Sequence, residues 1–353
     1  MLSIAAAAIL LGAQDPSAFD GRARVTEAVE TVRPVAYRSA QVDWPALESE
    51  LTAMAATARD TVDMLPVYRR LLDALGDHHS FVQASDELNA AYQDRRGRGL
   101  YGDVVRPPQA STFRGRDMIE HREVAVSESR SVQWIAVPKV FGSGERARAY
   151  ASHLFTATAD VPPRNCGYIV DVRGNTGGNV WPMLTGLSGL LGDGPAGRET
   201  KPDGRVTTYA ELKDGAAIIV EDGEFKGREI IASANWRPIP ALETSPVAVL
   251  MDDSTASSGE GVVVAFRGRS NTRSFGHRTV GVSTSNEGFE LSDGVNLVVT
   301  VGVMTDRQGT AYPQGLEPDE SVAFTPPVDG GEDSQIEAAR NWLAAQPQCA
   351  AAS

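Results

Sequence analysis

The first residues that could do chemistry are small hydroxyl residues between two apolar segments. The segment VAVLM (247–251) precedes the block TASSGE (255–260), and apolar residues return from Val262 to Phe266. A serine at a turn between a strand and a helix can present its hydroxyl as a nucleophile, with the next backbone N–H beside it. A plain turn has the same composition, so the block alone leaves both interpretations open.

A second candidate is the glycine-rich stretch VDVRGNTGGNV (170–180), which follows an apolar strand and precedes a helix. Glycines there let backbone N–H groups converge on an anion, because glycine reaches torsions closed to other residues. The spacing is not that of a dinucleotide-binding loop, and no phosphate-loop lysine follows. An oxyanion hole for acyl transfer remains possible, and so does a simple tight turn.

The third candidate is GDHHSF (76–81), in which His78 and His79 follow a helix. Histidine suits general-base work because its pKa of about 6.5 lies near the working pH. No other histidine, cysteine or carboxylate group has the spacing of a metal site. We therefore expect no metal and no cofactor.

Four motifs follow one another in the order of a known family. They are YIVDVRGNTGGNV, the stretch 247–266, GHRTVG, and LSDGVNLVVTVGVMTDRQGTAYPQGLEPDE. In this order they resemble the C-terminal processing (tail-specific) serine peptidases and their tricorn-core and retinoid-binding-protein relatives. The resemblance covers roughly residues 130–325, with GDHHSF as a further match upstream. It implies an α/β fold with a crotonase/ClpP-like β/α core behind a small helical N-terminal domain.

The resemblance also implies roles for individual residues. Ser257 would be the nucleophile, and the backbone amides of Ser258 and Gly178 would form the oxyanion hole. The tail-specific branch has a lysine base where this chain has Val282, and valine cannot accept a proton. The tricorn-like branch uses a histidine from a segment that resembles DHHS, which makes His79 the expected base and His78 its alternative.

A third catalytic group is less clear. The tricorn-like branch orients its histidine with a glutamate just before the G-x-x-P-D element, but here Tyr312, Pro313 and Gln314 precede Gly315. The possible orienting residues are Gln314, Glu260 and Glu317. The sequence does not choose among them.

The elements that must position these residues fall into five segments. We expect a signal peptide at 1–13, a helical N-terminal domain at 17–83 and a connecting segment at 84–129 with one helix at 86–96. Strands alternating with helices indicate a catalytic core at 130–325, followed by a C-terminal helix and tail at 326–353. A hairpin with a turn at Asp293-Gly294 is expected within the core. The connecting segment is too short for a peptide-binding PDZ module, which needs about 90 to 100 residues.

Composition narrows the location and the partners. The chain has 353 residues and a formal net charge of −13, which disfavours nucleic acid and anionic membrane surfaces as partners. The apolar start MLSIAAAAILLGAQ is too short to span a bilayer but fits a signal peptide, so we expect a periplasmic or secreted protein. The alternative is an N-terminal helix that packs on a cytoplasmic protein. The two cysteines, Cys166 and Cys349, could form one disulfide or remain free.

Together these features predict a serine endopeptidase that cleaves peptides or unfolded protein ends through an acyl-enzyme. The main alternative is a catalytically silent protein that binds a ligand or a peptide on the same core, because the lysine and the glutamate of the family are missing. An acyl-CoA enzyme is disfavoured, since nothing basic is placed for nucleotide phosphates. Cleavage specificity and oligomeric state are left open.

Overall fold

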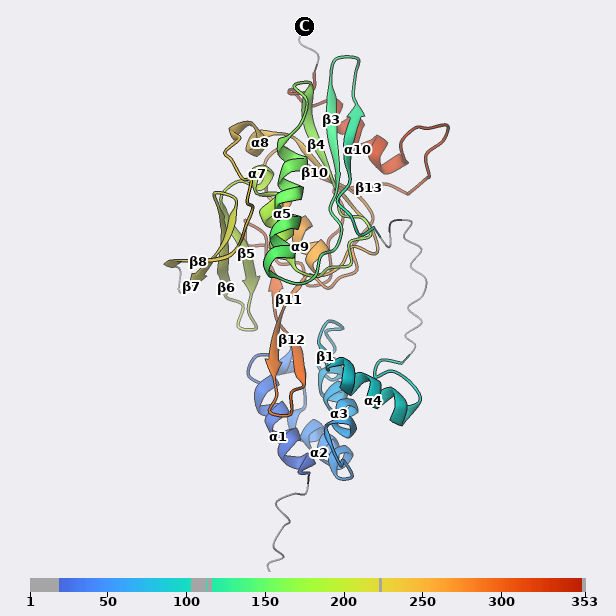
Figure 1. Cartoon of the computed structure of the whole chain (residues 1–353), viewed down its shortest axis with the longest axis vertical. Coiled ribbons are helices and arrows are strands. Elements are labelled where there is room, and N and C mark those ends of the chain that lie inside the picture. Colours follow the sequence, from blue (N-terminus) through green and yellow to red (C-terminus); the bar gives the residue numbers. More distant parts are fainter. Residues whose placement is uncertain (1–18, 103–112, 114–115, 222–223, 351–353) are drawn as a thin grey trace, which may run out of the picture. The chain divides into compact units, whose positions relative to one another are not determined.

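The computed structural model describes residues 19–102, 113, 116–221 and 224–350 (Figure 1). The predicted signal segment lies outside them. The chain divides into two compact units. The first unit contains the chain up to residue 102 together with Gly288–Val299, and the second contains the remainder.

The first unit is the predicted helical one. Aspartates at 20, 43 and 60 cap its first three α-helices by accepting a backbone N–H of the first turn, and Ser85 caps the fourth. Gly97 ends the fourth helix in a left-handed conformation. The elements are α1 (Gly21–Val32), η1 (Ser39–Gln41), α2 (Trp44–Ala55), α3 (Thr61–Asp73), β1 (Phe81–Gln83) and α4 (Asp86–Arg96).

The predicted hairpin forms, but its tip belongs to the first unit. It consists of β11 (Thr284–Glu290) and β12 (Asn296–Met304). Leu291, Val295 and Leu297 at the tip are buried in one apolar cluster with the helices. The hydroxyl of Tyr68 donates a hydrogen bond of 2.8 Å to Asp293. The segment 288–299 therefore belongs to the first unit and not to the core to which the sequence analysis assigned it, and α4 packs with the helices as well.

The second unit is built on a six-stranded sheet in the order β13-β10-β9-β4-β3-β2. All neighbouring strands are parallel except β2 and β3. Parallel neighbours need crossover connections. Those from β3 to β4, from β4 to β9 and from β9 to β10 contain the predicted helices, whereas the connection from β10 to β13 contains β11 and β12. The strands are β2 (His121–Ala125), β3 (Ser131–Ala136), β4 (Asn165–Asp171), β9 (Val247–Met251), β10 (Thr272–Gly276) and β13 (Glu320–Ser321).

Helices cover both faces of this sheet (Figure 1). In β9, Val249 packs into the cluster of α5 (Gly144–Ala159) and α9 (Ser258–Phe266), whereas Leu250 packs with α10 (Ser334–Ala344). Side chains alternate across a strand, so a strand covered on both faces is apolar throughout. This explains the uninterrupted VAVLM and confirms the predicted β/α core.

A meander of four antiparallel strands in the second unit was not anticipated. It contains β5 (Gly194–Thr200), β6 (Val206–Lys213), β7 (Ala216–Glu221) and β8 (Glu224–Ala232). A signal was present in Asp214-Gly215, a two-residue link in which both residues have positive φ. That dipeptide between two β-rich runs is typical of a tight hairpin.

Two details correct or settle the expectations for the second unit. The helix expected after the glycine-rich stretch is two helices, α6 (Val180–Gly186) and α7 (Ser188–Leu191), because Leu187 between them leaves helical geometry at φ −96° and ψ 4°. A short helix, α8 (Pro240–Thr244), precedes β9.

Cys166 and Cys349 form a disulfide, which joins the segment after α10 to the start of β4.

Candidate active site

Ser257 lies at the turn where β9 passes into α9. Its φ of 52° and ψ of −118° are outside the regions that serine adopts without strain. Such a conformation costs about 1 to 3 kcal/mol and persists only where the surroundings enforce it. The residue is half-buried, so its side chain remains reachable from solvent. This is the geometry that a serine nucleophile needs.

Glu260 enforces the turn. One oxygen of its carboxylate accepts hydrogen bonds from the backbone N–H of Ser257 and of Val282, both at 2.9 Å. The other accepts the hydroxyl of Thr279 at 2.6 Å and the N–H of Gly281 at 2.9 Å. Burial raises the pKa of Glu260, although these four bonds oppose the shift. The carboxylate therefore fastens the serine turn to the loop 279–282.

Asp252 ties the same turn to the glycine loop. Its carboxylate accepts the N–H of Gly174 at 3.1 Å and the hydroxyls of Ser254 and Thr255, both at 3.0 Å. The side chain of Thr255 also lies 3.0 Å from the carbonyl of Val172. The loops after β4 and β9 are thus held side by side, as expected for neighbouring parallel strands.

The glycines of this loop are needed for close approach. A Cβ on Gly177 would lie 2.8 Å from the Cβ of Ser257, and a Cβ on Gly178 would lie 2.1 Å from the carbonyl oxygen of Val140. Both glycines have φ above 110°, which side chains rarely allow. The backbone of Gly177 therefore rests directly against the candidate nucleophile.

Two backbone N–H groups are available to a bound anion. Within the described residues, neither the N–H of Gly178 nor that of Ser258 donates to an acceptor. The neighbouring N–H groups are occupied, since Gly177 donates to the Asn175 side chain at 2.9 Å and Ala256 donates to the Asn175 carbonyl at 3.0 Å. The two available donors are the pair that the sequence analysis assigned to an oxyanion hole.

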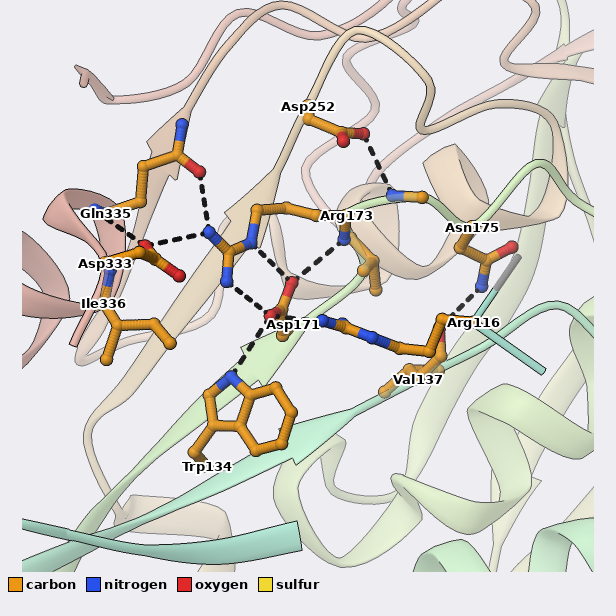
Figure 2. Close-up of polar contacts among 12 residues, drawn as sticks. Arg116, Trp134, Val137, Asp171, Arg173, Asn175, Asp252, Asp333, Gln335 and Ile336 are labelled. Carbon is orange, nitrogen blue, oxygen red and sulfur yellow. Dashed lines mark hydrogen bonds and ion pairs between the residues drawn. The ribbon is translucent and has the colours of Figure 1, made fainter. Parts of the chain in front are cut away.

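A buried ion pair underlies the glycine loop (Figure 2). The guanidinium of Arg173 binds both carboxylate oxygens of Asp171, at 2.8 and 2.7 Å, and reaches Asp333 and Gln335 at the start of α10. Burial would raise the pKa of Asp171, but Arg173 and Arg116 hold it below its usual value. The sequence analysis missed this network, although an arginine directly after a buried strand was a signal for it.

The remaining residues that the sequence analysis singled out in the second unit are Gln314, Glu317 and Val282. Gln314 is exposed, and Glu317, whose side chain is 72% exposed, pairs with Arg278 at 3.2 Å. Val282 occupies the position of the missing lysine, and its N–H is held by Glu260. Among the three possible orienting residues, only Glu260 lies beside Ser257.

His79 belongs to the first unit, where Asp77 organises its turn. The carboxylate of Asp77 accepts the N–H of His79 at 2.9 Å and both the N–H and the hydroxyl of Ser80 at 2.7 Å. Burial lowers the pKa of His79, and the charge of Asp77 opposes that shift. His78 is exposed and has a φ of 58°. Ser257 belongs to the second unit, so its pairing with His79 stays a prediction.

The described residues contain no group of three or more metal-ligating side chains, and none of their helices has the length and apolar character of a membrane span.

Comparison with protein families matches residues 144–322, just over half of the chain, to peptidase family S41. The chain belongs to peptidase family S41. The match contains the glycine loop, Ser257 and the loop 279–282, so the site lies within the region that defines the family. The predicted tail-specific protease family and its fold are thereby confirmed.

Two relatives have names that state a function. The nisin-resistance protein of Lactococcus lactis subsp. lactis is 25% identical over 76% of this chain and 73% of its own length. The carboxy-terminal processing protease CtpA of Bacillus subtilis (strain 168) is 28% identical over 43% of this chain, but the match spans only 28% of that protein.

Solved structures support the fold of the S41 chain. A lipoprotein from Streptococcus agalactiae matches with a TM-score of 0.64 at 20% identity and covers 95% of this chain and 99% of its own. A photosystem II D1 C-terminal processing protease matches with a TM-score of 0.57 at 15% identity, over 94% and 99% of the two chains. At these identities the likeness concerns the fold alone.

Proposed function

We propose that this S41 chain is a serine peptidase that cleaves peptides or unfolded protein ends through an acyl-enzyme. Ser257 attacks the scissile carbonyl carbon, and the N–H groups of Gly178 and Ser258 stabilise the oxyanion. His79 takes the proton of the Ser257 hydroxyl and returns it to the leaving amine. Water then hydrolyses the ester and regenerates Ser257.

The strained turn at Ser257 carries this proposal. Glu260, Asp252 and Gly177 together enforce a conformation that a structural turn would not need. Strain that several contacts maintain is concentrated at catalytic positions. Two N–H donors near this serine, those of Gly178 and Ser258, could stabilise the oxyanion that forms in acyl transfer.

An exposed apolar side chain beside the proposed hole, that of Phe141, favours a peptide substrate. Phe141 is 57% exposed and lies 3.3 Å from where a Cβ on Gly178 would stand. The N–H of Asn179 binds the carbonyl of Val140, and its side chain binds that of Gly142, so the backbone on both sides of Phe141 is fixed. Relatives are named for carboxy-terminal processing and for nisin resistance, so peptides with apolar residues, and nisin itself, are the first substrates to test.

A fluorophosphonate probe tests the proposal, because it labels an activated serine. The native protein should be labelled once, at Ser257, and Ser257→Ala should abolish labelling. Ser188→Ala is the matched control, because it removes a buried hydroxyl without a hydrogen-bond partner among the described residues. Labelling that persists unchanged in Ser257→Ala would exclude Ser257 as the nucleophile.

A second candidate is a binding protein without hydrolytic activity. It is favoured by Val282, which stands where the tail-specific branch has its lysine, and by the absence of a carboxylate at 312–314. Such a protein would bind peptides with a measurable affinity and release them uncleaved. Isothermal titration with a peptide, followed by mass spectrometry of that peptide, separates the two functions.

We also propose that the protein works outside the cytoplasm. The Cys166–Cys349 disulfide supports this, because such bonds persist in oxidising compartments and are rare in the cytosol. Thiol alkylation of the protein in fractionated cells tests it. Two alkylated cysteines in the native protein would contradict export.

A further inference from the structure

The hydroxyl of Ser258 has a partner that the reaction itself does not explain. It donates a hydrogen bond of 2.7 Å to the carbonyl oxygen of Gly178, and Ser258 is only 6% exposed. The two residues that share this bond are the two whose N–H groups would form the oxyanion hole. A direct bond therefore joins one side of the hole to the other.

We propose that the Ser258 side chain is a positioning residue that fixes Gly178 in the orientation the oxyanion hole requires. The proposal rests on the proposed function. It assigns two tasks to one residue: the backbone N–H of Ser258 contacts the oxyanion, and its side chain holds the second donor in place.

Gly178 needs such a restraint because its own backbone supplies little. It follows Gly177, and both glycines have positive φ, so neither has a side chain to limit rotation of the peptide between them. That peptide carries the N–H of Gly178. On one side the loop is held through Asn179, whose N–H binds the carbonyl of Val140 at 2.7 Å. The Ser258 hydroxyl holds it from the side of the nucleophile.

Two bonds between the loops enclose Ser257. Before it, the N–H of Ala256 binds the carbonyl of Asn175 at 3.0 Å, and after it, the hydroxyl of Ser258 binds the carbonyl of Gly178. Between these bonds Gly177 contacts the side chain of Ser257. The nucleophile and both donors are therefore held between these two bonds. Removal of the second bond leaves the Gly178–Asn179 peptide held from the side of Val140 and loosens Gly178 on the side of the nucleophile.

The same bond separates the roles of the two adjacent serines. The hydroxyl proton of Ser258 is directed at Gly178, and the side chain is buried. Ser257 is half-buried and reachable from solvent. Ser258 is thus a positioning residue rather than a second nucleophile.

The test is Ser258→Ala, which removes the hydroxyl and keeps the backbone N–H. We expect kcat on a peptide or ester substrate to fall about tenfold, less than the 10²–10³ loss when a hole donor is removed outright. KM should stay within about twofold, because the hole binds the oxyanion and not the ground state. The rate of fluorophosphonate labelling should fall in parallel, while one equivalent is still incorporated. Ser258→Thr retains a hydroxyl and should recover most of the lost rate.

The controls distinguish this inference from the function on which it rests. Ser188→Ala removes another buried hydroxyl and should leave kcat unchanged. A Ser258→Ala protein with wild-type kcat, beside an inactive Ser257→Ala protein, would overturn the positioning role and leave the peptidase intact. Equal losses in kcat and in substrate binding, without recovery in Ser258→Thr, would assign Ser258 to folding alone. If the native protein neither reacts nor turns over, the proposed function itself fails.

Discussion

The serine turn of the second unit and the histidine turn of the first are built in different ways. Ser257 is held in a strained conformation by contacts that lead to residues far away in sequence. Gly177 lies against its side chain, and Glu260, three residues after it, links its N–H to that of Val282. His79 is held by Asp77, two residues before it. The nucleophile therefore depends on tertiary packing, whereas the base depends on a local motif. Substitutions should affect the two turns differently, and the predictions below test that difference.

The largest effect is expected from His79→Ala. Loss of the general base should lower kcat by about 10²–10⁴, while the melting temperature should change little because the surrounding turn is maintained by Asp77. His78→Ala is the matched control and should retain near-native activity. The kcat values and melting temperatures of the two variants test this prediction. A larger loss of kcat in His78→Ala than in His79→Ala would make His78 the general base.

The pH dependence of the native enzyme extends this prediction. Activity requires neutral His79, so the rate should rise with pH along a single limb. Because burial lowers the pKa of His79, the midpoint of this limb should lie below the ordinary value of about 6.5. Asp77→Asn removes the charge that opposes the shift and should move the limb to still lower pH. If the midpoint of the limb is unchanged in Asp77→Asn, the group that titrates does not feel the charge of Asp77, and His79 is not the base.

Gly178→Ala should come next, on the side of the nucleophile. Its Cβ would collide with the carbonyl of Val140, so the N–H would turn away from the hole and kcat should fall by about 10²–10³. Gly309→Ala is the matched control, because Gly309 also has positive φ but has nothing within 4 Å of an added Cβ. It should lose about 1 kcal/mol of stability and no activity. Steady-state kinetics of both variants measure the effect. Equal losses of kcat in Gly178→Ala and Gly309→Ala would show that Gly178 has no special role in the oxyanion hole.

The contrast between local and tertiary structure also explains what the sequence could predict. The helix at 86–96 and the strand at 247–251 form at the predicted residues, because periodicity and burial are encoded within each segment. Ser257, Ser258 and Gly178 were named as candidates through the order of the motifs, and their roles stay predictions. The clamp by Glu260 could not be predicted, because its donors at 279–282 come near only in the folded chain. The hairpin tip was misplaced for the same reason, since the partner of its apolar residues is a distant helical core.

The smallest effect on activity is expected from the disulfide, because it joins the start of β4 to the chain after α10 and not the loops that hold Ser257. The double variant Cys166→Ser, Cys349→Ser should lose about 2 to 5 kcal/mol of stability, because the bond closes a long loop of the unfolded chain. Its kcat should stay within about twofold at low temperature, since Arg173 still holds the start of α10 through Asp333 and Gln335. Denaturant unfolding and kinetics at 15 °C to 25 °C measure the two quantities separately. A fall in kcat of more than tenfold without unfolding would contradict this expectation. It would show that the disulfide helps to position the glycine loop through α10 and Arg173. The serine turn would then depend on tertiary structure beyond its own hydrogen bonds.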